Sequence, residues 1–281
     1  MEKINHVISI SGGKDSAALA FYLRDKYPEI NFQYVFFDTG DELEETYVYL
    51  EKIEKALGID VQYIKPKKSF NELLRQYQGF LPSPTERWCT RHLKLEALLD
   101  YFKEGVIYNY VGIRADENRT GLIPQREDFK TVMPFKDDGI TLDDVKRILN
   151  ENQVGLPKYY DDIYDAEFDI TYHRSRSGCY FCFYMRQIEW VWLYEVHPDL
   201  YFKAAEFEKD GYSWMRDMTL QEFAKPENIR KVKESYKRYE EIKKKQKIKN
   251  GTMMEEMEFL AHQNGDFSDF EDDQFCSMCA L

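Results

Sequence analysis

Blocks of apolar and polar positions alternate regularly along the first part of the chain. Short apolar runs bounded by turn residues predict strands at residues 4–10, 32–37, 60–64 and 106–111. Apolar positions spaced three and four apart predict helices at residues 15–27, 42–57, 70–77 and 91–102. Strands that alternate with helices form right-handed βαβ units. We therefore predict an α/β fold with a doubly wound, mainly parallel sheet.

The pattern changes after Thr131. We expect a short extended piece at 132–135, a capped helix at 141–149 and an irregular stretch at 158–178. An aromatic helical region at 183–207, broken near His197, and one long helix at 226–249 should follow. The helices beyond residue 200 predict a C-terminal extension, so we place domain boundaries at 1–200 and 201–281.

The turn after the first predicted strand is Ser11-Gly12-Gly13-Lys14-Asp15-Ser16. A glycine turn between a strand and a helix gathers backbone N–H groups around one anion, and Lys14 adds a positive charge. Its spacing is not that of Walker A, which has four residues between its first glycine and the Gly-Lys pair. We expect this turn to bind the phosphates of a nucleotide; the alternative is a surface turn that happens to contain glycines.

Polar residues also follow two other predicted strands, Asp38 after the second and Gly112 and Arg114 after the fourth. Ligands of parallel sheets bind beyond the carboxyl ends of the strands. A carboxylate there can orient a ribose or a magnesium ion, and an arginine can bind phosphate. The alternatives are a helix N-cap for Asp38 and an ordinary surface arginine.

Five cysteines are present, namely Cys89 and the C-x-x-C pairs Cys179/Cys182 and Cys276/Cys279. In a reducing compartment, paired cysteines indicate metal or redox chemistry. Arg87 and Arg91 flank Cys89 and favour its thiolate form. Four thiolates could bind zinc, and a C-x-x-C turn could bind a cluster. The alternative for Cys89 is a buried apolar filler.

Together these motifs resemble the ATP pyrophosphatase (PP-loop) family of the adenine nucleotide alpha hydrolase superfamily, which includes the PAPS reductases and several thiolation enzymes. The resemblance covers residues 4–200 and includes the run Ser11–Ser16, the segment after Asp38, Cys89-Thr90 and the element Gly112–Arg119. It implies ATP bound by Ser11–Ser16, Asp38, Gly112 and Arg114. It also implies catalytic roles for Lys14, Asp15, Arg114 and Cys89.

Cys89 lies 90 residues before Cys179, and this separation resembles the iron–sulfur branch of the family. The resemblance implies a [4Fe-4S] cluster on Cys89, Cys179 and Cys182, with an open iron or with Cys279 or Cys276 as the fourth ligand; zinc and no metal at all are the alternatives. Cluster-containing reductases have a cysteine pair where this chain has Cys89 followed by a threonine. Their short C-terminal Glu-Cys-Gly motif is absent here.

The resemblance is nearest to the DNA phosphorothioation branch, which implies that ATP and Mg²⁺ adenylate a backbone phosphate for sulfur transfer. A sulfur donor such as a cysteine desulfurase is then expected, within a multiprotein complex. The alternatives are a tRNA thiolation enzyme, a sulfonucleotide reductase, and a non-enzymatic nucleotide-sensing subunit. The reductase branch usually lacks the lysine that this chain has at Lys14.

Charge is distributed unevenly along the chain. The 39 Lys and Arg against 51 Asp and Glu give a net charge of −12, and a uniformly acidic surface would repel nucleic acid. Residues 225–249, however, hold eleven Lys or Arg and four Glu, whereas residues 251–281 hold eight acidic residues and no Lys or Arg. The basic helix could contact DNA, or it could simply be a solvated helix. With no secretory leader and no apolar run of about 20 residues, we expect a cytoplasmic protein without a membrane segment.

Overall fold

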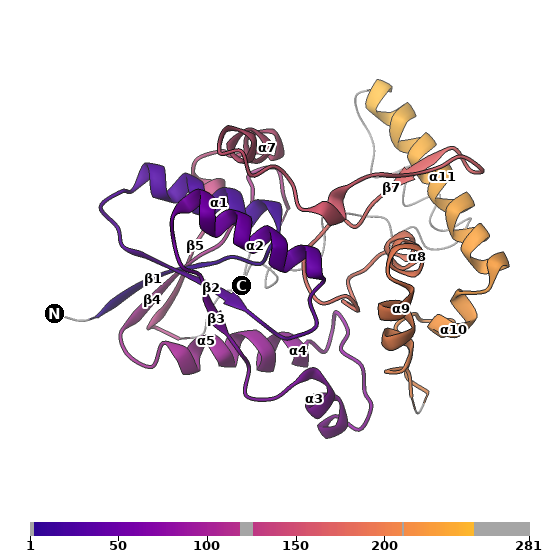
Figure 1. Ribbon diagram of the computed structural model, residues 1–281, viewed down its shortest axis with the longest axis horizontal. Coiled ribbons are helices and arrows are strands. Elements are labelled where there is room, and N and C mark those ends of the chain that lie inside the picture. Colours follow the sequence, from indigo (N-terminus) through magenta and orange to yellow (C-terminus); the bar gives the residue numbers. More distant parts are fainter. Residues whose placement is uncertain (1–2, 119–125, 210, 250–281) are drawn as a thin grey trace. The chain divides into compact units, whose positions relative to one another are not determined.

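The parallel sheet predicted for the first part of the chain is present in the computed structural model, which describes residues 3–118, 126–209 and 211–249 (Figure 1). Its strands lie in the order β3-β2-β1-β4-β5 and pair in parallel. They are β1 (Ile4–Ser9), β2 (Phe32–Phe37), β3 (Gln62–Ile64), β4 (Val106–Tyr110) and β5 (Phe129–Val132). The strand order reverses beside β1, so the switch point lies between β1 and β4. The prediction of a doubly wound α/β fold is confirmed.

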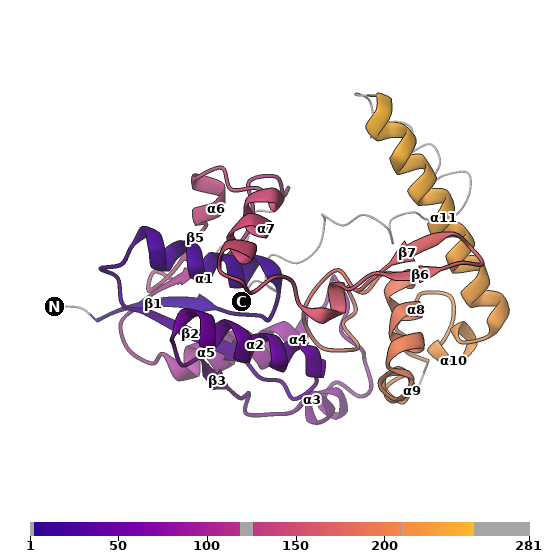
Figure 2. The same ribbon diagram turned by 45° about the horizontal axis from the view of Figure 1, so that its top comes forward.

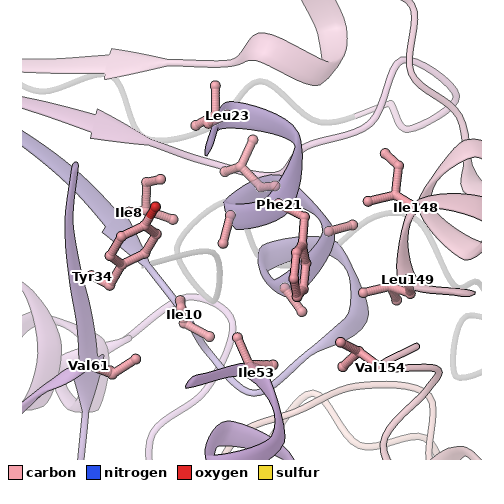
Figure 3. Packing of buried hydrophobic residues seen from close by; sticks show 14 of the residues in the cluster. Ile8, Ile10, Phe21, Leu23, Tyr34, Ile53, Val61, Ile148, Leu149 and Val154 are labelled. Carbon is pink, nitrogen blue, oxygen red and sulfur yellow. The ribbon is translucent and has the colours of Figure 1, made fainter. Parts of the chain in front are cut away.

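Helices cover both faces of this sheet. The helices of this part of the chain are α1 (Lys14–Lys26), α2 (Glu44–Leu57), α3 (Phe70–Gln76), α4 (Trp88–Thr90), α5 (Glu96–Tyr101), α6 (Pro134–Asp137) and α7 (Leu142–Glu151). Successive residues of β1 point to opposite faces, so Ile8 packs in the cluster with α1, α2 and α7, and Val7 packs in the cluster with α5. Figure 3 shows Phe21 of α1 within the first of these clusters. Burial on both faces explains why the strands are nearly continuous apolar runs.

Two predicted boundaries shift for local reasons. The helix predicted at 91–102 begins earlier, at Trp88, and passes through a π-helical turn, η1 (Arg91–Leu95), before α5. The extended piece predicted at 132–135 ends at Val132, because Pro134 occupies the first turn of α6. The predicted cap of α7 is confirmed, since Thr141 and Asp144 form a capping box.

The described residues divide into two compact units. The first contains residues up to 160 together with 176–182, and the second contains 161–175 and the residues after 182. The elements of the second unit are β6 (Ile163–Asp165), β7 (Ile170–Tyr172), α8 (Gln187–Val196), α9 (Pro198–Ala205), α10 (Leu220–Phe223) and α11 (Pro226–Lys249). This division differs from the expected boundary at residue 200, which lies inside α9. Tyr194 of α8 stacks edge-on against Tyr201 of α9, with ring centroids 5.1 Å apart, so these helices stay together.

The stretch 158–178, expected to be irregular, contains a short 3₁₀ turn, η2 (Lys158–Tyr160), and the antiparallel hairpin β6–β7. Figure 2 shows this hairpin beside α11, which contacts β7. The predicted break near His197 and the long helix at 226–249 are both confirmed. Across the ranges that the structure describes, no helix is both long and apolar enough to cross a bilayer.

Candidate functional site

The glycine loop, Ser11–Ser16, joins the end of β1 to the start of α1. Gly12 has a φ of +74°, and a Cβ atom there would lie 2.5 Å from Cγ2 of Thr46, so this position requires glycine. The N-cap of α1 is Gly13, which has no side chain to cap the helix. The first-turn N–H groups of this 13-residue helix are therefore not occupied by an N-cap side chain, as anion binding requires.

Residues from two strand ends converge at this loop. The Arg114 guanidinium, after β4, donates to the Asp15 carboxylate over 2.8 Å, and Lys14 Nζ lies 3.3 Å from the same carboxylate. A Cβ atom on Gly112 would lie 2.8 Å from the Asp15 carbonyl oxygen. Gly112 thus lets the end of β4 approach the start of α1. The structure brings together Lys14, Asp15, Gly112 and Arg114, as the parallel sheet predicted.

Arg114 is buried among three carboxylates, because Asp116 and Glu117 lie 2.9 and 2.7 Å from it in addition to Asp15. Burial lowers the pKa of Arg114, but these carboxylates outweigh that effect and hold it above its usual value. Burial likewise raises the pKa of Asp15, and Lys14 and Arg114 outweigh it, so this pKa lies below its usual value. The charge of Arg114 is therefore balanced within the protein, and its contacts fix Asp15 at the start of α1.

Two tyrosines that the sequence reasoning missed contact the glycine loop. The buried Tyr159 hydroxyl donates to the Gly12 carbonyl over 2.6 Å. Lys14 Nζ donates to the Tyr160 hydroxyl over 3.1 Å and lies 5.0 Å from the centre of its ring. Both tyrosines belong to η2, so this short turn holds the backbone of the loop and the side chain of its lysine. A 3₁₀ turn of three residues leaves no periodic pattern from which to predict it.

Asp38 lies in the loop after β2, beyond the carboxyl end of that strand. Its Oδ1 accepts hydrogen bonds from the Tyr47 hydroxyl, over 2.8 Å, and from the Gly40 N–H, over 3.1 Å. Helix α2 begins at Glu44 with Leu43 as its N-cap, so Asp38 is not a helix cap. Its carboxylate, which also faces Lys65 at 3.9 Å, is held at the strand end where the sequence predicted it.

The cysteine segments also belong to the first unit. Cys89 is the middle residue of α4, and Cys182 donates its N–H to the Cys179 carbonyl over 3.1 Å, which closes the C-x-x-C turn. The Phe70 ring contacts Trp88 at 5.1 Å and Phe181 at 4.3 Å between centroids. Both segments therefore pack against the same aromatic ring.

The environment of Cys179 is partly acidic. Its Sγ lies 3.4 Å from the Thr39 hydroxyl, and burial together with the nearby Glu42 carboxylate raises the pKa of the thiol. Burial also raises the pKa of Glu42, although Thr39 donates to it over 2.7 Å. Within the described ranges, no three His, Cys, Asp or Glu side chains are grouped so as to hold a metal ion. Arg119, Cys276 and Cys279 lie outside the described residues.

The basic helix α11 uses part of its sequence for packing. Val232 and Tyr236 are buried, and Lys233 is buried between Asp165, at 2.7 Å, and Glu195, at 2.6 Å. Burial lowers the pKa of Lys233, but the two carboxylates hold it above its usual value. The described basic side chains exposed on this helix are Arg230, Lys231, Arg238, Lys243 and Lys244. The described charged side chains exposed on this helix are therefore mostly basic, with Glu227 and Glu241 among them, and Arg230 pairs with Glu234 at 3.1 Å.

Comparison with known families gives a match to the family described as Phosphoadenosine phosphosulfate reductase domain, over residues 5–169. The chain is 30% identical over 213 residues to Uncharacterized protein MJ0973 of Methanocaldococcus jannaschii, which covers 73% of this chain and 48% of that protein. It is 34% identical over 116 residues to Uncharacterized protein MJ0066 of the same organism, covering 40% of this chain and 23% of that protein. The chain thus spans about half the length of the first relative and less of the second.

Two solved structures share a weaker likeness. One is the phosphoadenylyl-sulfate (PAPS) reductase from Candida auris in its phosphate complex, with a TM-score of 0.42, 16% identity, and coverage of 60% of this chain and 84% of that one. The other is the U34-tRNA thiolase NcsA from Methanococcus maripaludis with its [4Fe-4S] cluster, with a TM-score of 0.42, 14% identity, and coverage of 74% and 71%. Assignment to the family rests on the match over residues 5–169.

Proposed function

Because this chain belongs to the phosphoadenosine phosphosulfate reductase domain family, we propose that it uses ATP to activate an oxygen atom for replacement by sulfur. The glycine loop carries this proposal. The anion site consists of the backbone N–H groups of this loop, its glycines and Lys14. It lies at the start of α1, next to the switch point of the sheet. Lys14 favours ATP over a sulfonucleotide, because reductases of this family usually have a loop without it.

The proposed reaction begins with ATP, its β- and γ-phosphates bound at the glycine loop. An oxygen of the acceptor attacks the α-phosphorus, a new P–O bond forms, and the bond to the departing pyrophosphate breaks. Lys14 would balance the negative charge that develops on pyrophosphate, and Asp15 and Tyr160 would hold its ammonium in place. Magnesium bound with ATP would also stabilise this negative charge. Asp38, at the neighbouring strand end, is the carboxylate that would bind the magnesium ion or the ribose.

The acceptor we propose is a DNA backbone phosphate, as in DNA phosphorothioation. Helix α11 supports this choice, because its exposed side holds basic residues in an otherwise acidic chain. Contacts with phosphates release counterions, so binding through this helix should weaken steeply with salt. A tRNA acceptor would use the same surface. A sulfur donor such as a cysteine desulfurase, with a thiol reductant and within a multiprotein complex, would supply sulfide. The sulfide would form the new bond to the activated phosphorus, and AMP would leave.

Three cysteines of the first unit have thiolates of the type that binds an iron–sulfur cluster, with zinc as the alternative metal, although the described side chains are not grouped as a metal site. Cys89, Cys179 and Cys182 would hold the group, with Cys279 or Cys276 as the fourth ligand. Bound there, a cluster would carry the sulfur to be transferred. Anaerobic purification followed by iron and zinc analysis and a visible spectrum tests this assignment. Cys89→Ser should lose both the metal and the visible colour. A variant that keeps both would refute the assignment of Cys89 as a ligand.

A second candidate function is sulfonucleotide reduction, which the description of the family favours. The two are separated by incubating the anaerobic protein either with ATP, magnesium and DNA, or with a sulfonucleotide and thioredoxin. Pyrophosphate release in the first mixture supports the proposed reaction. Sulfite release in the second mixture, with no pyrophosphate release in the first, would instead support the reductase function. Nucleotide binding without either product would favour a nucleotide-sensing subunit.

A further inference from the structure

A serine far along the chain from the glycine loop contacts it directly. The Ser177 hydroxyl donates to the Ser11 hydroxyl oxygen over 3.1 Å, and Ser11 Oγ lies 3.1 Å from Ser16 Oγ. Ser16 Oγ in turn lies 3.2 Å from the Gly13 carbonyl oxygen, to which it donates. Three hydroxyls thus form a continuous chain of hydrogen bonds along the loop.

The contact between Ser177 and the loop is also a close steric fit. A Cβ atom on Gly13 would lie 2.9 Å from Ser177 Oγ, so glycine at position 13 leaves room for this hydroxyl. The serine therefore lies against the loop backbone at the residue that caps α1, as well as against the Ser11 side chain. Its hydroxyl belongs to the surroundings of the proposed phosphate site.

Ser177 also begins the segment that carries the C-x-x-C turn. Gly178, with a φ of +124°, follows it, and then Cys179 pairs with Glu42 in an isolated β-bridge. The Tyr180 N–H donates to the Asp41 carbonyl over 2.9 Å. The segment is thus attached to the glycine loop at Ser177 and to the loop after β2 at residues 179–180.

We propose that Ser177 is a positioning residue that couples phosphate binding at the glycine loop to the order of the C-x-x-C turn. The inference rests on the proposed nucleotide site, and it extends that function by linking the activation site to the sulfur-handling residues. The hydroxyls of Ser11 and Ser16 each have one hydrogen to donate. A bound phosphate would accept hydrogen bonds from both hydroxyls, and Ser177 would then donate to Ser11 Oγ or to the phosphate. In either case the network would contain charge-assisted hydrogen bonds, which are stronger than those between neutral hydroxyls.

The test is amide hydrogen exchange of the full chain, with and without saturating ATP and magnesium, and separately with pyrophosphate. The reporters are the N–H groups of Tyr180 and Cys182, which donate the bonds that hold the turn. In the natural chain, either ligand should slow their exchange roughly threefold to tenfold, the effect of about one hydrogen bond. Ser177→Thr, which keeps the hydroxyl, should retain this slowing, whereas Ser177→Ala should bind ATP but lose it. Ser235→Ala, a serine of α11, is the matched control and should behave like the natural chain.

The inference is overturned if Ser177→Ala shows the same ligand-dependent slowing as the natural chain, or if the natural chain binds ATP without any slowing. Loss of ATP binding in Ser177→Ala would also overturn it, because the serine would then act in binding itself. If pyrophosphate slows exchange through Ser177 but ATP is never cleaved, the coupling stands and the proposed reaction fails. If the natural chain binds neither ligand, both fail.

Discussion

Asp15 faces two cations of the site, Lys14 and Arg114, and Asp15→Asn tests what its charge contributes. The carboxylate contacts two cations, Arg114 at 2.8 Å and Lys14 at 3.3 Å. Breaking a buried ion pair typically costs about 3–5 kcal/mol. Arg114 keeps Asp116 and Glu117, and asparagine keeps an acceptor oxygen, so we expect the variant to lose only about 1–3 kcal/mol of unfolding free energy.

The loss of unfolding free energy in Asp15→Asn should become smaller as the pH falls. The folded-state pKa of Asp15 lies below its usual value, so its ionised form stabilises the protein at every pH above the unfolded pKa of about 4. That contribution is lost as the pH falls through the folded pKa. The difference between the natural chain and Asp15→Asn should therefore be constant from pH 7 to about pH 5 and narrow below about pH 4.

Urea unfolding followed by circular dichroism across this pH range measures the effect. Asp25→Asn is the matched control, because it makes the same substitution on the same helix in an exposed pair with Arg24. Exposed pairs contribute about 0–1 kcal/mol, so this variant should differ little from the natural chain. An equal loss of unfolding free energy in both variants, or a loss for Asp15→Asn that grows as the pH falls, would show that the Asp15 carboxylate is not stabilised by Lys14 and Arg114.

Two further substitutions test contacts that the sequence did not reveal. Tyr159→Phe removes the hydrogen bond to the Gly12 carbonyl and should cost about 1–3 kcal/mol in urea unfolding, because it leaves a buried acceptor without its donor; an unchanged midpoint would contradict this. Lys233→Met leaves two carboxylates without their buried cation and should destabilise the second unit by about 3–5 kcal/mol, whereas the exposed Lys231→Met should cost less than about 0.5 kcal/mol. Similar thermal midpoints for these two lysine variants would show that the buried pair contributes little.

Much of the first unit could be predicted because its strands are buried on both faces. Their apolar runs are bounded by turns, and the rule that ligands bind at strand ends correctly predicts that Arg114 lies near the glycine loop. The hairpin β6–β7 could not be predicted in this way. Its strands have three residues each, and Tyr164 is 63% exposed, so neither strand has a recognisable period.

The contacts that complete the site were inaccessible to sequence reasoning for a different reason. Tyr159 and Ser177 reach the glycine loop across 147 and 166 residues of sequence. No local pattern marks a tyrosine or serine as the partner of so distant a loop. The position of the π-helical turn after Cys89 was equally hidden, because its residues have the same apolar spacing as an ordinary helix.

The proposed reaction requires the glycine loop to hold ATP while the bond between its α- and β-phosphates is cleaved. The most direct measurement is the rate of pyrophosphate release from ATP and magnesium, with DNA present, by the natural chain, Lys14→Met and the exposed-lysine control Lys52→Met. We expect pyrophosphate release by the natural chain and by Lys52→Met, and a rate roughly 100-fold or more lower for Lys14→Met, as for loss of one group that stabilises developing charge. Equal rates for all three proteins, or no pyrophosphate from any of them, would contradict it.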